Sequence, residues 1–573
     1  MRLALAQINT RVGDLAGNCR LIADRIQKAR SLDADVVVFP ELAVTGYPPE
    51  DLLLSPDFLR ATMAALEELV PASRGLTVIV GSAYVNRTLH NAAVVLHNGQ
   101  IAGVYRKQLL PNYGVFDENR YFHPGHQKLV FSRGEAVLGI SICEDIWYPD
   151  GPPQAQAARG GANILVNISA SPYHVGKGQG RERMLATRAA DNLTFVAYCN
   201  LVGGQDELVF DGQSLICGPQ GQVLARAQQF EEDFLVADLD VREVFRARLA
   251  DRRHAAPVVC DFESVALPPS TVVKKPLDVA MAERLDRLPE IYRALVLGTH
   301  DYVTKNGFVQ VVLGLSGGVD SSLTAAIAVD ALGASSVVGI AMPTRYSSAH
   351  SLTDAEQLAR NLGIRYSAIP IDRTFQSFLD SLAPIFEGRQ PNLTEENLQP
   401  RIRGTMLMAL SNKFGWLVLT TGNKSEVSVG YATLYGDTAG GFAVIKDVPK
   451  TLVYELSRYR NQVAGYDLIP NNVLVKAPSA ELRPDQKDSD SIPEYDTLDL
   501  ILHAYVEDSA SVDDIVARGF PRDVVLKVIR LVDLNEYKRR QSPPGVKITP
   551  RAFGKDWRLP ITKSLDRRAA GTP

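Results

Sequence analysis

Hydrophobic residues in the first 250 positions follow two alternating patterns. Short apolar runs rich in β-branched residues predict strands, whereas the spacing of apolar residues over 18–32 and 181–192 predicts helices. Asn98-Gly99 and Pro219-Gln220-Gly221 each separate two strands and predict hairpins. This mixture predicts a layered α/β domain over residues 1–250. The predicted strands are Leu3–Ile8, Val36–Phe39, Thr77–Val85, Ala92–Leu96, Ile101–Tyr105, Val137–Ile142, Asn163–Ile168, Thr194–Tyr198, Ser214–Cys217 and Gln222–Ala225.

The pattern changes after residue 250. Residues 251–278 are rich in proline and valine, lack a clear period, and predict a linker. Strand and helix patterns then alternate over 279–560, which predicts a parallel, doubly wound sheet with its ligand at the carboxyl ends of the strands. Residues 561–573 predict a frayed tail. The predicted helices are Val279–Tyr302, Leu323–Ala331, Ser351–Asn361 and Asn392–Phe414, and the predicted strands are Val309–Leu313, Ser336–Met342, Tyr366–Ile371 and Leu417–Thr421.

Composition narrows the class of protein. A chain of 573 residues with 46% hydrophobic and 22% charged residues predicts a soluble globular protein of two large domains. The net charge of −4 gives no electrostatic reason to expect nucleic acid as a partner. Because no apolar run is long enough for a membrane span and the start lacks a signal-peptide pattern, we expect a cytoplasmic protein. The five cysteines form no Cys-x-x-Cys pair, so neither a disulfide framework nor a zinc site is indicated.

One glycine-rich stretch, Gly314–Ser322, lies between a predicted strand and a predicted helix. Glycines there let a ligand approach the backbone, and the N–H groups at the helix start favour an anion. The stretch lacks the lysine and the spacing of a Walker A loop, but it resembles the S-G-G-x-D-S pyrophosphate loop of the ATP pyrophosphatase family. Members of that family adenylate a substrate and release pyrophosphate. The resemblance assigns ATP to Gly314, Leu315, Ser316, Gly317, Gly318, Val319, Asp320, Ser321 and Ser322, and Mg²⁺ to Asp320.

Three reactive residues follow predicted strands in the first half. Glu41, Lys107 and Cys143 occur in the order and approximate spacing of the Glu-Lys-Cys triad of the nitrilase superfamily, which they resemble. A carboxamide is a poor electrophile, so a thiolate must attack it. Glu41 would accept the thiol proton, and Lys107 would stabilise the oxyanion. The resemblance also implies that glutamine is held by Tyr113, Ser171 and Lys177, the last standing where relatives can carry arginine.

Four longer stretches join the two halves into one family resemblance. Residues 45–53 and 203–212 resemble the glutaminase domains of glutamine-dependent NAD synthetases, and residues 419–426 and 448–452 resemble their synthetase domains. The resemblance implies a nitrilase-like α-β-β-α domain and a doubly wound domain of the adenine nucleotide alpha hydrolase type. It further implies that ATP and Mg²⁺ activate deamido-NAD as an adenylate. Ammonia released from glutamine would then displace AMP to give NAD.

The same resemblance assigns the remaining site residues. Thr421 and Lys450 would contact ATP, and Glu426 would join Asp320 at Mg²⁺. Two of the residues assigned to deamido-NAD, Asn397 and Lys538, could instead be polar side chains that only face solvent. Residues matched only in synthetase-fused relatives would line the ammonia route or an interface, or else only shape the glutamine pocket. The deamido-NAD residues are Asn397, Arg403, Glu426 and Lys538, and the route residues are Tyr47, Gln205 and Asp206.

Three other classes of protein compete with this interpretation. A synthetase for GMP or asparagine would carry a glutaminase with Cys-His-Glu or an N-terminal cysteine, and no histidine stands in a triad position here. A tRNA-modifying thiolase would need further catalytic cysteines and a basic face. A scaffold with a decayed site would be expected to lose Cys143 or Asp320. We therefore predict an enzyme of small-molecule substrates, with a homo-oligomer (dimer or octamer) expected.

Overall fold

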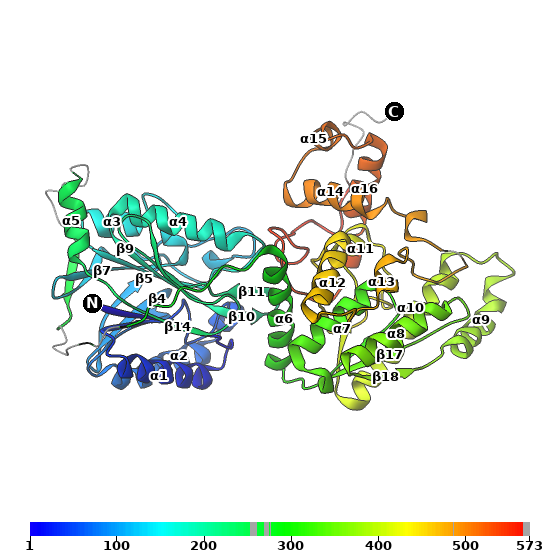
Figure 1. Cartoon of the computed structure of the whole chain (residues 1–573), viewed down its shortest axis with the longest axis horizontal. Coiled ribbons are helices and arrows are strands. Elements are labelled where there is room, and N and C mark those ends of the chain that lie inside the picture. The colour runs from blue at the N-terminus through cyan, green and yellow to red at the C-terminus, as the bar shows by residue number, and fades with distance from the viewer. Residues whose placement is uncertain (252–260, 269–273, 275–276, 485, 565–573) are drawn as a thin grey trace. The chain divides into compact units, whose positions relative to one another are not determined.

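The computed structural model describes residues 1–251, 261–268, 274, 277–484 and 486–564 (Figure 1). It divides into two compact units, Met1–Glu290 and Ile291–Pro573, each with its own sheet or sheets. Parts of the predicted linker (252–260, 269–273 and 275–276) and most of the predicted tail (565–573) lie outside the described residues. Among the helices that the structure describes, none combines the length and the apolar character needed to cross a membrane.

Two mixed sheets form the framework of the first unit. The first has the strand order β14-β1-β2-β3-β4-β5 and the second the order β13-β12-β9-β8-β7-β6-β15, while β10 and β11 form a separate hairpin. The strands are β1 (Arg2–Gln7), β2 (Val36–Val38), β3 (Thr77–Asn86), β4 (Thr88–His97), β5 (Gln100–Arg106), β6 (Leu129–Arg133), β7 (Ala136–Ile142), β8 (Ile164–Ser169), β9 (Phe195–Asn200), β10 (Val202–Gln205), β11 (Leu208–Asp211), β12 (Leu215–Cys217), β13 (Val223–Arg226), β14 (Asp233–Asp238) and β15 (Glu263–Ala266).

Strand β1 shows why strands of this unit are apolar at successive positions: both of its faces are buried. Successive side chains point to opposite faces, so Leu3 and Leu5 pack between the two sheets while Ala4 and Ala6 pack toward the outer helices. Helices α1 and α2 cover the outer face of the first sheet, and α3 and α4 cover that of the second (Figure 1). The predicted α-β-β-α layering is thus confirmed. The helices are α1 (Leu15–Ser31), α2 (Pro56–Leu69), α3 (Pro152–Ala158), α4 (Lys177–Asn192) and α5 (Arg242–Ala250).

Both predicted hairpins of the first unit are present. Asn98 and Gly99 have φ of 49° and 80° and connect the antiparallel strands β4 and β5. Two predictions at the end of this unit are wrong. Residues 263–266 of the expected linker form β15, which pairs in parallel with β6, because its backbone groups complete the open edge of the second sheet. The helix expected from Val279 begins only at Arg287.

The second unit is built on one parallel sheet with the order β18-β17-β16-β19-β20. Strands β17 and β18 follow β16 in the sequence and lie on one side of it, whereas β19 and β20 lie on its other side. This reversal is the switch point at which doubly wound sheets bind ligands, because the loops after β16 and β19 diverge there. The predicted doubly wound fold is confirmed. The strands are β16 (Val311–Gly314), β17 (Val337–Ala341), β18 (Arg365–Ala368), β19 (Leu417–Thr420) and β20 (Phe442–Ala443).

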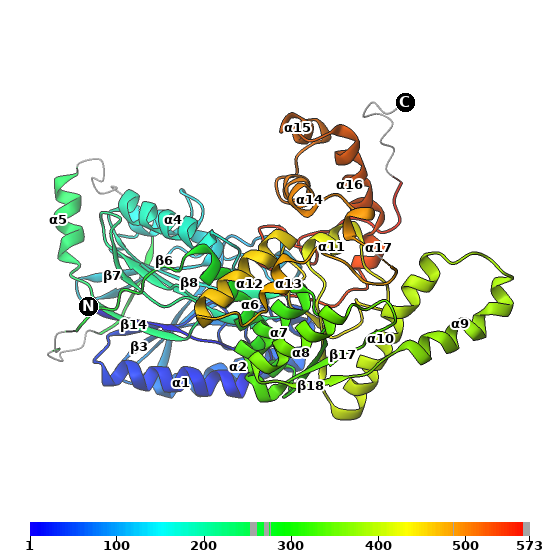
Figure 2. The same cartoon turned by 45° about the vertical axis from the view of Figure 1, so that its right-hand side comes forward.

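Helices surround this sheet, and the last ones form a cluster of their own. Helices α14, α15 and α16 gather at one end of the second unit around buried residues such as Leu498, Ile515 and Val528 (Figure 2). The sequence motifs do not predict these C-terminal helices. The helices are α6 (Arg287–Lys305), α7 (Val319–Leu332), α8 (Ala349–Leu362), α9 (Asp372–Phe386), α10 (Leu393–Phe414), α11 (Lys424–Val429), α12 (Lys450–Ala464), α13 (Asn471–Val475), α14 (Tyr495–Leu502), α15 (Val512–Ala517), α16 (Arg522–Leu534) and α17 (Glu536–Arg539).

Candidate functional sites

The three predicted reactive residues of the first unit meet at the ends of their strands. Glu41 follows β2, Lys107 follows β5, and Cys143 opens a short 3₁₀ turn directly after β7. Lys107 Nζ donates to Glu41 Oε1 at 2.7 Å, and the charges of both residues act on the Cys143 thiol. Cys143 has a φ of 43°, a region that side chains rarely adopt, which marks a sharp turn at this position. All three side chains are buried.

Hydrogen bonds from several directions orient the Glu41 carboxylate. Asn91 Nδ2 donates to its Oε1 at 2.7 Å, and the backbone N–H of Ala170 donates to its Oε2 at 2.9 Å, so the carboxylate is held from two sides. Burial, and then the negative charge of Glu41, raise the pKa of the Cys143 thiol, and the nearby Lys107 only partly opposes them. These surroundings therefore favour the neutral thiol over the thiolate.

A second carboxylate shares Lys107 and was not predicted. Lys107 Nζ donates to Glu118 Oε1 at 2.8 Å, and the Tyr47 hydroxyl donates to the same oxygen at 3.3 Å. Burial raises the pKa of Glu118 to about 7, with the Glu41 charge adding to it and Lys107 opposing it. Burial alone would lower the pKa of Lys107, but Glu118 and Glu41 raise it well above its ordinary value. Lys107 is thus a fixed cation between two carboxylates.

Asp145 joins the segment of Lys107 to the turn of Cys143. Its Oδ2 accepts from the Tyr105 hydroxyl at 2.9 Å and from the Ile142 N–H at 3.0 Å, and its Oδ1 accepts from the Leu109 N–H at 2.9 Å. Burial raises the pKa of this carboxyl to about 6, although these hydrogen bonds favour its charged form. Because the flanking backbone on both sides is bound to one side chain, the distance between Lys107 and Cys143 is held by the fold.

The predicted glutamine residues lie on two segments around this centre. The Tyr113 hydroxyl donates to both carboxylate oxygens of Glu144, the neighbour of Cys143, at 2.9 Å, and both residues line a cavity of about 410 Å³. Ser171 is buried next to Ala170, which binds Glu41. Lys177 begins α4, and its Nζ donates to the Pro172 carbonyl at 2.8 Å. Glu144, which directly follows Cys143, is not among the residues predicted from the sequence.

The predicted route residues are not all brought together. The buried Tyr47 ring packs edge-on against Phe210 of β11, with 5.8 Å between ring centroids, and its hydroxyl binds Glu118. Gln205 and Asp206 lie at the turn between β10 and β11, where Asp206 has a φ of 54°. Tyr47 therefore belongs to the surroundings of Lys107, whereas the other two form the tip of a hairpin.

In the second unit, the glycine-rich stretch forms the loop between β16 and α7. Gly317 has a φ of 77°, and a Cβ there would lie 2.2 Å from the carbonyl oxygen of Ser351. Ser316 Oγ accepts from the Gly318 N–H at 3.2 Å and lies 3.2 Å from Ser321 Oγ, so the loop is stabilised by its own hydroxyls. The residue at 317 must be glycine for the loop to pass Ser351 at this distance.

Asp320, Glu426 and Lys450 converge beside this loop. Lys450 Nζ donates to Asp320 Oδ2 and lies 3.3 Å from Glu426 Oε1, while Asn423 Nδ2 donates to Asp320 Oδ1 at 2.8 Å. Asn423 and Glu426 also form the capping box that begins α11. Burial raises the pKa of Glu426 to about 8, with Lys450 opposing and Asp320 adding to the shift. Asn423 lies within the stretch 419–426 but is not among the residues predicted from the sequence.

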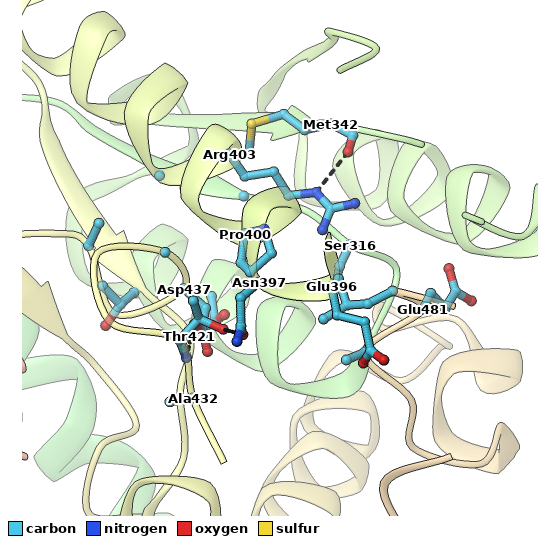
Figure 3. A pocket seen from close by; sticks show the side chains of 18 of the residues that line it. Ser316, Met342, Glu396, Asn397, Pro400, Arg403, Thr421, Ala432, Asp437 and Glu481 are labelled. Carbon is cyan, nitrogen blue, oxygen red and sulfur yellow. Dashed lines mark hydrogen bonds between the residues drawn. The ribbon is translucent and has the colours of Figure 1, made fainter. Parts of the chain in front are cut away.

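A cavity of about 500 Å³ opens at the switch point of the sheet (Figure 3). It is lined by Ser316 after β16, Thr421 after β19, and Asn397 and Arg403 of α10. Arg403 reaches into it with Nε donating to the Met342 carbonyl at 3.0 Å (Figure 3). Burial lowers the pKa of Arg403 to about 10, while Glu481 and Asp437 act in the opposite direction. A buried guanidinium of this kind favours an anionic ligand.

Lys538 also lines the cavity, and several acidic neighbours were not predicted. Lys538 Nζ donates to the carbonyl oxygens of Gly430 and Ala432 at 2.7 and 2.9 Å, and Thr433 Oγ1 donates to Asn397 Oδ1 at 2.7 Å. Asn397 and Lys538 are therefore half-buried in the wall of the cavity. The sequence offered no signal for the acidic lining, because its members come from separate loops and helices. They are Glu396, Asp437 and Glu481.

Comparison with known proteins gives the same division of the chain. The profile of the carbon-nitrogen hydrolase family matches residues 2–248, and that of the NAD synthase family matches residues 291–542. The glutamine-dependent NAD(+) synthetase of Thermotoga maritima is 48% identical over 573 residues, covering 98% of each chain. That of Aquifex aeolicus is 48% identical and covers 99% of this chain and 100% of its own. In a solved structure, the glutamine-dependent NAD+ synthetase of Acinetobacter baumannii in complex with ADP is 42% identical to this chain, with a TM-score of 0.74 and 98% of each chain covered.

Proposed function

The chain belongs to the family of glutamine-dependent NAD(+) synthetases, and we propose that its two sites divide the reaction as follows. The first unit releases ammonia from glutamine, and the second uses ATP and that ammonia to convert deamido-NAD to NAD, AMP and pyrophosphate. The observation that carries this division is the pair of sites itself. A buried Cys-Glu-Lys centre lies in the unit matched by the hydrolase profile, and a glycine-rich loop lies at the switch point of the unit matched by the synthase profile.

In the first site, Cys143 Sγ attacks the carboxamide carbon of glutamine while Glu41 takes the thiol proton. Lys107 stabilises the oxyanion that forms, being held 2.7 Å from Glu41 and 2.8 Å from Glu118. Glu41 then gives its proton to the departing nitrogen, and ammonia leaves behind a glutamyl thioester. Water attacks the thioester as Glu41 takes its proton, and this proton returns to the Cys143 sulfur when glutamate leaves.

Glutamine carries an α-ammonium and an α-carboxylate group, so its binding site needs a negatively charged and a positively charged side chain. Glu144 is buried, faces the cavity that Tyr113 lines, and suits the α-ammonium group. Ser171 and Lys177 suit the α-carboxylate, since one offers a hydroxyl and the other a cation. The geometry of Tyr113 against Glu144 supports this arrangement.

In the second site, the loop after β16 binds the ATP phosphates through its backbone N–H groups at the start of α7. Thr421 lies across the switch point, and Lys450 supplies a cation, so these residues complete the ATP site. Asn397, Arg403 and Lys538 hold deamido-NAD in the 500 Å³ cavity, Arg403 through the phosphates. The carboxylate of its nicotinate attacks the α-phosphorus, pyrophosphate leaves, and ammonia then displaces AMP at the carbonyl carbon.

The carboxylates beside Lys450 fit Mg²⁺. Asp320 and Glu426 already meet one cation, with Glu426 Oε1 3.3 Å from Lys450 Nζ, and oxygen ligands are those that Mg²⁺ prefers. When bound, Mg²⁺ would neutralise charge on the ATP phosphates. Asp320 and Glu426 would hold it, and Asn423 keeps Asp320 oriented through its 2.8 Å hydrogen bond.

Ammonia needs a protected route from the first site to the second. Only unprotonated ammonia is nucleophilic, so it must reach the second site without loss to water, and we assign Tyr47, Gln205 and Asp206 to this route. We assign glutaminase activity to residues 1–250 and synthetase activity to 279–560, because the two family matches fall inside these ranges. We also propose a cytoplasmic homo-oligomer.

The wild-type chain tests the proposal with deamido-NAD, ATP and Mg²⁺ supplied with glutamine or with ammonium. NAD, AMP and pyrophosphate should form in equal amounts from either source, with glutamate at least equal to NAD in the glutamine reaction. Xanthosine monophosphate and aspartate in place of deamido-NAD test the synthetases of GMP and asparagine. Turnover of either one, without turnover of deamido-NAD, would contradict the proposal.

A further inference from the structure

Four consecutive residues at the start of α11 face two different parts of the second unit. Asn423 and Glu426 face Asp320 and Lys450, with distances of 2.8 Å for Asn423 Nδ2 to Asp320 Oδ1 and 3.3 Å for Lys450 Nζ to Glu426 Oε1. Lys424 and Ser425 face the other way, toward the C-terminal helices. The spacing explains this division, because residues three apart share one side of a helical turn.

Asp499 of α14 connects α11 with α12. Its Oδ1 accepts from Ser425 Oγ, and its Oδ2 accepts from the N–H and the hydroxyl of Thr451 at 2.9 and 2.8 Å. Ser425 Oγ in turn accepts from the Lys450 N–H at 2.8 Å. Helix α12 begins after Pro449, whose side chain provides no cap, so Asp499 supplies the acceptor that the first turn lacks.

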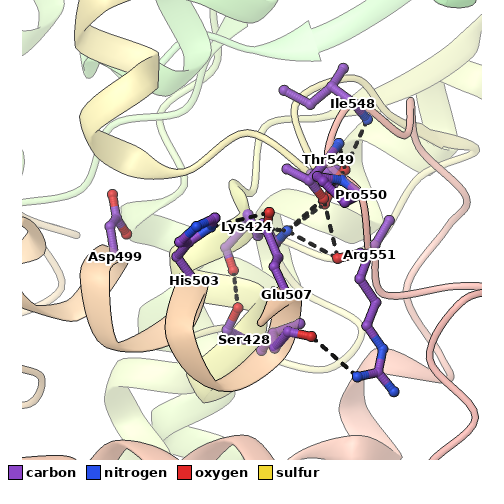
Figure 4. Close-up of polar contacts among 12 residues, drawn as sticks. Lys424, Ser428, Asp499, His503, Glu507, Ile548, Thr549, Pro550 and Arg551 are labelled. Carbon is purple, nitrogen blue, oxygen red and sulfur yellow. Dashed lines mark hydrogen bonds and ion pairs between the residues drawn. The ribbon is translucent and has the colours of Figure 1, made fainter. Parts of the chain in front are cut away.

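Lys424 anchors the first turn of α11 to the C-terminal part of the unit (Figure 4). Its Nζ lies 2.8 Å from Glu507 Oε1, 3.0 Å from Asp447 Oδ1 and 2.7 Å from Thr549 Oγ1. It also donates to the Arg551 carbonyl at 3.2 Å. The side chain is buried and its donors are engaged, so its role is to fix α11 against the C-terminal segment.

We propose that Asp499 is a positioning residue for the second site. It sets the first turns of α11 and α12, and thereby holds Glu426 and Lys450 against Asp320, with Lys424 as a second anchor. The inference rests on the proposed roles of these three residues. A displacement of about 1 Å at reacting groups can cost roughly 100-fold in rate, so a group that touches no substrate can control turnover in this way.

The decisive comparison is between Asp499→Ala and Asp499→Asn. Asparagine can still accept from Thr451 through its oxygen and donate to Ser425 through its nitrogen, whereas alanine does neither. We expect Asp499→Ala to lower kcat of ammonium-supported NAD synthesis by about 10- to 100-fold, with KM for deamido-NAD changed less than about threefold. Asp499→Asn should retain kcat within about fivefold, and glutamine hydrolysis should equal wild type in both.

A matched control separates positioning from general stability. Asp533 of α16 is a carboxylate of the same C-terminal helices, and it accepts from the Tyr505 hydroxyl at 2.9 Å. Because Asp533 is buried whereas Asp499 is half-buried, Asp533→Ala should lower Tm at least as much as Asp499→Ala but keep kcat. If Asp499→Ala does not fold, Ser425→Ala serves, since it removes only the link between Asp499 and the Lys450 N–H. It should lower kcat with a fall in Tm no larger than that of Asp533→Ala, although it leaves the buried Lys450 N–H without its acceptor.

Three results would overturn the inference. They are full kcat in Asp499→Ala or in Ser425→Ala, an equal loss of kcat in Asp533→Ala, and a loss in Asp499→Asn as large as that in Asp499→Ala. The last would mean that charge, rather than position, is what Asp499 supplies. Failure of the proposed function itself is recognised separately, because wild type would then make no NAD from ammonium in the same assay.

Discussion

Replacing Lys107 by methionine would remove a buried cation and keep the length of the side chain. Its Nζ lies 2.7 Å from Glu41 and 2.8 Å from Glu118, and side chains of both Lys107 and Glu41 are 0% exposed. The variant would therefore leave two carboxylates buried without their cation. Breaking a buried pair in this way costs about 3–5 kcal/mol, which corresponds to a fall in Tm of roughly 5–8 °C for a unit that spans Met1–Glu290.

The same change should remove the stabilisation of the oxyanion. We expect glutamine hydrolysis to fall by at least about 100- to 1,000-fold, the loss seen when one oxyanion donor is removed. Calorimetry of the first unit's transition and glutamate release measure the two effects. Ammonium-supported NAD synthesis is the internal control and should stay near wild type, because Lys107 lies only in the first site.

The double variant Lys107→Met/Glu118→Gln separates stability from catalysis. It removes one of the two uncompensated charges, so Tm should recover in part while glutamine hydrolysis stays lost. If Lys107→Met keeps its Tm, the carboxylates do not depend on this cation. If glutamine hydrolysis survives in either variant, Lys107 does not stabilise the oxyanion, and the reasoning about this site is refuted.

Three other predictions follow from single positions. Gly317→Ala should lower NAD synthesis from both nitrogen sources by about 100-fold, because its Cβ would lie 2.2 Å from the Ser351 carbonyl oxygen. Gly318→Ala should lower it far less, because its Cβ would lie 3.3 Å from Ser316 Oγ. Equal losses in the two variants would contradict the loop geometry. Burial and Asp211 raise the pKa of Glu290 to about 7 from 4.5, so the free energy of unfolding of the wild type should fall as the pH rises between these values. In urea unfolding, the stability of Glu290→Gln relative to wild type should be up to ~3 kcal/mol greater at pH 8 than at pH 5. An equal difference at both pH values would refute this. Tyr47→Ala, but not Tyr47→Phe, should raise the glutamate released per NAD formed; an unchanged ratio would make Tyr47 only a pocket residue.

Local patterns were sufficient for the framework of both units. The β-branched runs that became β2, β8 and β16 are buried on both faces, so their composition predicted strands directly. The loop at 314–322 was found because strand, glycines and helix are consecutive in sequence. The C-terminal helices carried no motif, and their packing around Leu498 and Val528 depends on contacts with one another.

The functional groups that were not predicted from the sequence act through contacts with residues that are not their neighbours in the chain. Glu118 stands in a segment without period, and its importance appears only when the fold brings it 2.8 Å from Lys107. Asp499 likewise lies 74 residues from Ser425, the hydroxyl that it accepts from. Asn423 lies inside the stretch 419–426, and Glu144 directly follows Cys143, so both were within reach of sequence reasoning. A polar side chain next to a reactive one is a natural candidate for orienting it.

The division of labour between the two units is tested most directly by one assay with two nitrogen sources. Cys143→Ala should form no NAD from glutamine while keeping nearly all synthesis from ammonium. Asp320→Asn should lose synthesis from both sources, because asparagine offers a neutral oxygen where a carboxylate is preferred for Mg²⁺, and it should still bind and hydrolyse glutamine. Loss of ammonium-supported synthesis in Cys143→Ala, or full synthesis by Asp320→Asn, would contradict the account.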